Sequence, residues 1–306
     1  MTFREWSRDA VSHVREDGVA EGGQRAAREF YQGLLRQTGR RLNYGRRIYD
    51  YDWDMVVVLD ACRADLMAEV ADEYSFTSRQ IGYSCASSSG EWHLKNFGDE
   101  YAEQKADTGL VSANPYTDMH IDADDFHLLD EVWRDAFDSD AGTVLADRVT
   151  DRAITAHREH RPGRLVVHYM QPHYPFVPEQ FSDDGGGMAL GYDHTPWDTV
   201  WDRLRKGDIS RERAWEGYRE NLRYVLDHVG TLLQNVDADR VIITADHGNL
   251  LGEFGLYAHP QYVPIPALKR VPWIVTSGTD EGDHQPEERE PTETDLDDQL
   301  EALGYK

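Results

Sequence analysis

The chain has 306 residues, of which 40% are hydrophobic and 11% aromatic, and this is enough to build the core of one large α/β domain. Acids outnumber bases by 57 to 32, so that the net charge is −25. Such a chain offers phosphates no broad cationic face, and the composition therefore argues against sequence-independent binding of nucleic acids.

The composition also predicts the solvent and the cellular compartment in which the protein works. Only five lysines occur, and a lysine-poor, acid-rich protein stays soluble by self-repulsion, as in the high-salt cytosol of a halophilic archaeon. Residues 1–20 are charged throughout, and no stretch approaches the ~20 apolar residues needed to span a bilayer. The two cysteines, Cys62 and Cys85, are too few for a disulfide framework. We therefore expect a cytoplasmic protein without a transmembrane segment, and leave peripheral membrane contact and the oligomeric state open.

Residues 1–50 are predicted to form a separate helical segment. Phe30, Tyr31 and Leu34 recur at helical spacing within it. The segment ends in a basic run, residues 39–47, in an otherwise acidic chain. Such a run more often pairs with local acids, and the alternative is that it holds an anionic headgroup.

Buried strands and helices alternate in the middle of the chain. Apolar runs predict strands at 55–59, 165–170, 241–244 and 271–275, and a helix over about 211–236. This alternation predicts an α/β fold, a three-layer α/β/α sandwich with a mostly parallel central sheet. We assign residues 51–278 to this domain.

Two segments outside these elements have their own character. Residues 177–215 contain three consecutive glycines and three tryptophans, and form either a substrate-facing cap or a surface insertion. Residues 279–306 are acidic and poor in large apolar side chains, which predicts a flexible tail.

Polar residues follow three of the predicted strands, namely Asp60, His173 and the pair Asp246-His247. Taken singly, an aspartate there is more often a helix cap, and a histidine beside proline is usually a surface residue. In a doubly wound sheet, however, the carboxyl ends of the strands form the ligand-binding edge. Together these side chains predict a site for a divalent metal ion.

A cluster of small polar residues, 84–90, lies just before a predicted helix that starts near Glu91. A serine at a helix N-terminus lies where backbone N–H groups and the helix dipole favour an anion. A metal ion at the same place would activate its hydroxyl as a nucleophile. The alternative is a helix cap within a small-residue turn.

Three segments resemble motifs of the alkaline phosphatase and sulfatase superfamily, and their order and spacing also fit. The segments are Val58–Asp65, Tyr169–Phe176 and Thr244–His259, the last containing Asp-His-Gly, then Leu-Gly-Glu, then a histidine. The resemblance covers about residues 50–278. Within the superfamily, the chain resembles the catalytic domains of lipoteichoic acid synthases and phosphoethanolamine transferases. The resemblance implies an alkaline-phosphatase-like fold and a metal-dependent enzyme that acts on phosphate or sulfate esters.

The resemblance also implies roles for single residues. Asp60, Asp246 and His247 match the metal ligands. His173 and His259 match positions that contact the anionic group of the substrate or assist the leaving oxygen.

The nucleophile should come from the serine cluster and should also contact the metal. Aligning Glu91-Trp92 with the acid–aromatic pair of lipoteichoic acid synthases points to Ser87. Counting from Cys85, by analogy with phosphoethanolamine transferases, points to Ser89. Ser87 is preferred as nucleophile and metal ligand, and Ser89 is the alternative.

Two departures from sulfatases favour phosphate over sulfate esters. The serine cluster lacks the arginine of the signature that directs formylglycine formation, and Ala61 stands where sulfatases have a second acid. The sequence thus predicts a phosphoester hydrolase or phosphotransferase that forms a covalent phosphoserine on a small-molecule, glycan or lipid-linked ester. An imidazole ligand favours Mn²⁺ or Zn²⁺, with Ca²⁺ or Mg²⁺ as alternatives. The rival hypotheses are a sulfatase, a non-catalytic scaffold of the same fold, and an interaction protein that works through residues 1–50.

Overall fold

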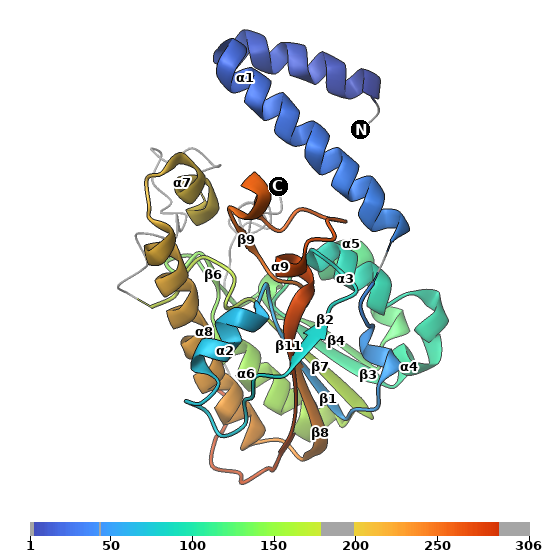
Figure 1. Ribbon diagram of the computed structural model, residues 1–306. Coiled ribbons are helices and arrows are strands. Elements are labelled where there is room, and N and C mark those ends of the chain that lie inside the picture. The colour runs from blue at the N-terminus through green and yellow to red at the C-terminus, as the bar shows by residue number, and fades with distance from the viewer. Residues whose placement is uncertain (1–2, 43, 179–198, 288–306) are drawn as a thin grey trace.

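A computed structural model describes residues 3–42, 44–178 and 199–287 (Figure 1). Within them, seven strands form one sheet in the order β2-β11-β8-β1-β7-β3-β4. The neighbours from β8 to β4 pair in parallel, whereas β11 is antiparallel to both β8 and β2. The strands of this sheet are β1 (Met55–Leu59), β2 (Ile81–Tyr83), β3 (Thr108–Ser112), β4 (Leu128–Glu131), β7 (Arg164–Tyr169), β8 (Ala238–Thr244) and β11 (Arg270–Gly278).

Helices cover both faces of the sheet (Figure 1). The α-helices are α1 (Phe3–Arg41), α2 (Ala64–Val70), α3 (Ser89–Asn96), α4 (Ala102–Ala106), α5 (Tyr116–His120), α6 (Ala146–Thr155), α7 (Val200–Lys206), α8 (Arg211–Leu233) and α9 (Pro266–Lys269). Two small hairpins pair β5 (Phe137–Asp138) with β6 (Thr143–Val144), and β9 (Leu250–Leu251) with β10 (Tyr257–Ala258).

The alternation of side chains along β1 explains the layers. Val57 and Leu59 point into a core shared with α2, α6 and α8, while Val56 and Val58 point into a second core that includes side chains of α3. All residues of β1 are buried, as expected for a central parallel strand that is covered on both faces. The predicted three-layer α/β/α sandwich with a mostly parallel sheet is therefore confirmed.

The N-terminal helix α1 is interrupted at Gly18 and extends outward from the body of the molecule (Figure 1). Its C-terminal end rests on the segment that contains β10 and α9. Leu35 packs against the small core formed there, and the Tyr44 hydroxyl donates to the carbonyl oxygen of Pro264 at 3.1 Å. No helix among the described residues has the length and hydropathy needed to cross a membrane.

Residues 279–287, the first part of the expected tail, contact the body of the molecule. The amides of Thr279 and Glu281 donate to carbonyls at the end of α8, each at 2.8 Å, and Asp280 forms an ion pair with Arg158 at 2.6 Å. These bonds hold the segment against the body of the molecule. Residues 288–306 lie outside the described residues.

The segment 177–215, predicted to be a cap or an insertion, is described only in part. Residues 179–198 lie outside the described residues. From its remainder, Trp201 on α7 is buried and packs edge-to-face on Tyr218 of α8, with ring centroids 5.9 Å apart.

Candidate active site

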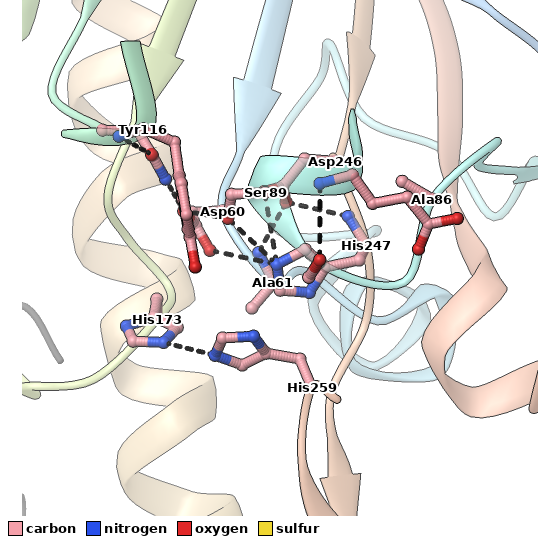
Figure 2. Close-up of polar contacts among 12 residues, drawn as sticks. Asp60, Ala61, Ala86, Ser89, Tyr116, His173, Asp246, His247 and His259 are labelled. Atoms are coloured by element: carbon pink, nitrogen blue, oxygen red, sulfur yellow. Dashed lines mark hydrogen bonds and ion pairs between the residues drawn. The ribbon is translucent and has the colours of Figure 1, made fainter. Parts of the chain in front are cut away.

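Two carboxylates meet at the carboxyl ends of β1 and β8. Val58 pairs with Thr244 in the parallel ladder, and each chain continues two residues further to an aspartate, so Asp60 and Asp246 point to the same face. His247 follows directly. Ligand atoms of Asp60, Asp246 and His247 all lie within 4.8 Å of one another, and all three residues are buried (Figure 2). The structure thus brings together the three predicted metal ligands.

The electrostatics of this cluster fit a bound cation. Burial raises the pKa of both carboxyls, and the neighbouring charge of Asp246 raises the pKa of Asp60 further. Asp60 Oδ1 and Asp246 Oδ2 are buried and have no hydrogen-bond partner among the described residues. A divalent ion would satisfy both oxygens and offset the repulsion between the carboxylates.

His247 is oriented to serve as a ligand. Its Nδ1 lies 2.7 Å from the carbonyl oxygen of Gly248, so Nδ1 carries the proton and Nε2 presents its lone pair to the cluster. Two carboxylates with a neutral imidazole fit Zn²⁺ or Mn²⁺.

At Gly248, the residue after His247, a side chain would not fit, because a Cβ atom would lie 2.1 Å from the carbonyl oxygen of Ala267.

Ser89 is the serine that lies at the cluster. Its Oγ is 3.3 Å from Asp60 Oδ2 and 3.2 Å from His247 Nε2 (Figure 2). Ser89 is the first residue of α3, and Ser88 is the N-cap, whose side chain accepts from the amide of Glu91. The hydroxyl is therefore next to two of the three candidate metal ligands, Asp60 and His247, and to the positive end of a helix dipole.

The structure places Ser87 elsewhere, against the preferred expectation. Its hydroxyl lies 2.8 Å from Glu91 Oε2 and accepts from the amide of Val263 at 3.0 Å. Glu91 Oε2 also accepts from the amides of Ser87 and Tyr262, each at 3.0 Å. These bonds join Ser87 and Glu91 in one cluster, the Ser87–Glu91 cluster. It ties the start of α3 to the loop that follows His259.

His173 and His259 meet beside the metal cluster. Their Nε2 atoms are 3.0 Å apart, and the rings of His259 and His247 stack with centroids 4.6 Å apart (Figure 2). His173 Nδ1 lies 2.5 Å from the carbonyl oxygen of Tyr174, which leaves its Nε2 as an acceptor for the proton on His259 Nε2. Burial is the main cause that lowers the pKa of His259 to about 3 and the pKa of His173 well below its usual value. Both imidazoles are thus neutral near pH 7.

Two further residues at the site were not predicted. Asn114, just beyond β3, donates to Asp60 Oδ2 at 2.7 Å. His168 in β7 is buried, with Nε2 at 3.7 Å from Asp60 Oδ2 and 3.8 Å from Asp246 Oδ2. Burial, followed by the nearby His93, lowers the pKa of His168 well below its usual value. A histidine inside an otherwise apolar strand was the signal for His168, whereas β3 itself was not recognised in the sequence.

The buried histidines predict how stability depends on pH. Burial lowers the pKa of His93 and His247 to about 4, below the ~6.5 of an unfolded chain. Because the unfolded chain then binds more protons, each histidine should cost up to about 1.4 kcal/mol of unfolding free energy per pH unit as the pH falls below 6.5. The carboxyl pair has the opposite effect because its pKa is raised in the folded protein. Its contribution to the free energy of unfolding of the metal-free protein is lost as the pH rises from ~3.9 to about 7.

The pKa is also lowered in the buried His168, His173 and His259, so five histidines oppose two carboxyls and dominate below pH ~6.5. We therefore expect the free energy of unfolding of the metal-free protein to be largest near pH ~6.5. Urea titrations across the range from about pH 4.5 to 8 would measure it. A free energy that rises steadily down to the lowest pH would contradict the assignment of neutral buried histidines.

The mostly parallel sheet, the helices on both faces and the cluster at the strand ends define a three-layer α/β/α protein with a candidate metal site at the carboxyl edge of its sheet. The model of the sulfatase family matches residues 78–301, more than half of the chain, and the chain belongs to this family. The match includes Ser89, His173, the Asp246-His247 pair and His259. Family membership supports an enzyme that acts on sulfate or phosphate esters.

Solved structures with a similar fold are distant in sequence. Lipooligosaccharide phosphoethanolamine transferase A, an integral membrane protein from Neisseria meningitidis, is 13% identical with a TM-score of 0.47. The alignment covers 91% of this chain and 60% of the transferase, so the chain spans less than two thirds of that protein.

Two periplasmic domains give similar values. That of phosphoethanolamine transferase EptC from Campylobacter jejuni is 15% identical, with 72% of this chain and 78% of the domain covered and a TM-score of 0.46. The zinc complex of the Escherichia coli EptC domain is 10% identical, with 78% and 77% covered and a TM-score of 0.46. No curated protein matches the chain. These comparisons do not support the expected halophilic archaeal origin.

Proposed function

We propose that the protein is a metal-dependent phosphoester hydrolase or phosphotransferase whose nucleophile is Ser89. One observation carries this proposal: Ser89 Oγ lies within 3.3 Å of two members of the Asp60, Asp246 and His247 cluster, at the N-terminus of α3. A divalent ion held by that cluster would supply Lewis acidity and charge neutralisation at the reacting oxygens.

In the first half-reaction Ser89 becomes a phosphoserine. The Ser89 hydroxyl gives its proton to Asp60 Oδ2, which lies 3.3 Å away. Ser89 Oγ then forms a bond to phosphorus while the bond to the leaving oxygen breaks. The departing oxygen takes a proton from solvent, and the neutral His173–His259 pair, which shares one N–H between its Nε2 atoms, stabilises the anionic oxygens by hydrogen bonding.

The second half-reaction releases the phosphoserine. Water or an acceptor alcohol attacks phosphorus, releases its proton to solvent, and frees Ser89 Oγ, which regains its proton from Asp60. The choice between water and an alcohol separates a hydrolase from a transferase. We propose a small-molecule, glycan or lipid-linked phosphate ester as the substrate.

The surroundings of Cys85 support phosphate rather than sulfate as the reacting group. Cys85 is buried, and its Sγ lies 3.4 Å from Asn96 Nδ2. Burial raises the pKa of the thiol to about 11. A formylglycine formed from this cysteine would face Asn96 rather than the metal cluster.

Removing the metal tests the proposal directly. We expect the protein to hydrolyse p-nitrophenyl phosphate or bis-p-nitrophenyl phosphate, and expect chelation to lower kcat/KM by a factor of about 100 or more. Mn²⁺ or Zn²⁺ should restore activity. The assays should include high KCl because of the acidic composition.

p-Nitrophenyl sulfate, the sulfate counterpart of p-nitrophenyl phosphate, tests the sulfatase alternative in the same assay. Turnover of the sulfate alone would show that the protein is a sulfatase. Absence of turnover on all three esters, with no metal bound to the purified protein, would instead support a non-catalytic scaffold.

A further inference from the structure

The C-terminal half of α1 and the connector after it differ in charge from the rest of the molecule. Between residues 25 and 47, here called the basic segment, the sequence has seven arginines and a single acid, Glu29. The whole chain has a net charge of −25. With seven arginines and one acid, this stretch has a net charge of +6 in a strongly acidic molecule.

Among the arginines of this segment whose side chains the structure describes, most form no ion pair with an acid. Among the described residues Arg47 forms an ion pair with Glu100 at 3.0 Å, and Arg40 lies over the Tyr262 ring at 4.8 Å. Arg36 and Arg41 are exposed and form no ion pair with any described residue. The sequence left two alternatives for the basic run, and pairing with local acids accounts for only part of it.

Apolar side chains are exposed beside these arginines. Tyr31, Leu34 and Leu42 are 37%, 53% and 67% exposed. Tyr31 and Leu34 are three residues apart and share one side of α1, while Leu35 turns toward the protein. Arg41 follows Leu34 by seven residues and thus lies on the same side of the helix as the exposed apolar residues.

The basic segment lies at the same end of the molecule as the candidate active site. Gly39 contacts the backbone of Tyr262, and the Tyr44 hydroxyl binds the carbonyl of Pro264. Both contacts are to the loop that follows His259. From this point α1 extends outward, clear of the sheet (Figure 1).

We propose that the basic segment binds the surface of an anionic lipid bilayer. Tyr31, Leu34 and Leu42 insert at the level of the headgroups, and Arg41 contacts lipid phosphates. Arg36, on the opposite side of the helix, adds attraction over a distance comparable to the Debye length. Exposed apolar side chains beside unpaired cations are typical of interfacial helices, whereas nucleic acid would match the charge but not the apolar side.

Vesicle co-sedimentation tests this proposal with the full-length protein. The vesicles are pure phosphatidylcholine, or an equal mixture of phosphatidylcholine and phosphatidylglycerol, in about 0.1 M KCl, where charges are only partly screened. We expect binding to the mixed vesicles and little binding to the neutral ones. The double variant Arg36→Glu/Arg41→Glu should bind at least about tenfold more weakly, since each basic residue near an anionic surface contributes about fivefold.

A matched double variant controls for the change in net charge. Arg79 and Arg240 are exposed arginines outside the basic segment, and Arg79→Glu/Arg240→Glu should leave binding within about twofold of wild type. A second variant, Leu34→Ser/Leu42→Ser, tests insertion and should remove the binding that persists at high salt. Circular dichroism in the same buffer verifies that each protein is folded.

Two results would overturn the proposal. One is an equal loss of binding in the control and in the basic-segment variant, or no binding of wild type to anionic vesicles. The other is self-association through the basic segment, seen by sedimentation velocity without lipid and abolished in Arg36→Glu/Arg41→Glu. Because vesicle binding is measured without turnover, failure here leaves the proposed phosphoesterase function untouched.

Discussion

Replacing Ser89 by alanine is expected to reduce kcat for phosphoester hydrolysis by at least ~1000-fold, because the substitution removes the only hydroxyl that contacts both Asp60 and His247 among the described residues. The three buried cluster residues remain, so the variant should still bind one divalent ion per chain. Initial rates with p-nitrophenyl phosphate and metal analysis of the same preparation measure the two effects.

Ser87→Ala distinguishes the two serines. It should lower activity by only about tenfold, because it loosens the Ser87–Glu91 cluster that holds the loop following His259. Ser78→Ala, in the loop between α2 and β2, should have no effect on activity. The larger loss in Ser87→Ala, with Ser89→Ala near wild type, would return the nucleophile to Ser87.

Asp246→Asn is expected to have opposite effects on activity and on stability. Asp246 Oδ1 accepts from the amides of Ala61 and His247 at 2.9 and 2.8 Å, and an asparagine oxygen can keep both bonds. Its amide nitrogen replaces the oxygen that would bind the metal. Metal affinity and turnover should therefore fall by about 1000-fold or more, while the metal-free variant becomes more stable at pH ~8 than the metal-free wild type, because one of two buried charges is removed.

Thermal unfolding with and without metal measures this contrast. In wild type, metal at about 1000 times its Kd should add about 4 kcal/mol to the free energy of unfolding, and in Asp246→Asn it should add almost nothing. Asp72→Asn, at an exposed position, should respond to metal like wild type. If metal stabilised Asp246→Asn as much as wild type, the ion would have to bind elsewhere.

The fold was predictable where strands are buried on both faces. β1, β7 and the second half of β8 are buried apolar runs, and hydrophobicity alone reveals them. The apolar run 271–275 also revealed β11, although that strand is partly exposed. β2 and β4 are short and contain exposed or half-buried residues, so they lack that pattern. β3 is buried, but its composition, Thr-Gly-Leu-Val-Ser, is not apolar enough to distinguish it from a loop.

The part of the candidate site that directly follows paired strands was predictable, because the strands determine where those residues lie. Asp60 and Asp246 occupy equivalent positions after two paired parallel strands, so strand ends suffice to bring them together. The choice between Ser87 and Ser89 depends instead on where α3 begins. A start near Glu91 was expected, whereas α3 begins at Ser89 itself, and two residues of helix rotate a side chain by about 200°.

The contact between Gly39 and Tyr262 has a mechanical consequence. A Cβ atom at position 39 would lie 2.0 Å from the carbonyl oxygen of Tyr262, so α1 rests on the loop backbone to backbone, without a side chain between them. Two backbones in direct contact cannot move closer together, because close-packed protein atoms are nearly incompressible. A tilt of α1 therefore displaces the Tyr262 carbonyl, three residues from His259, and the orientation of the helix and the position of that imidazole cannot vary independently.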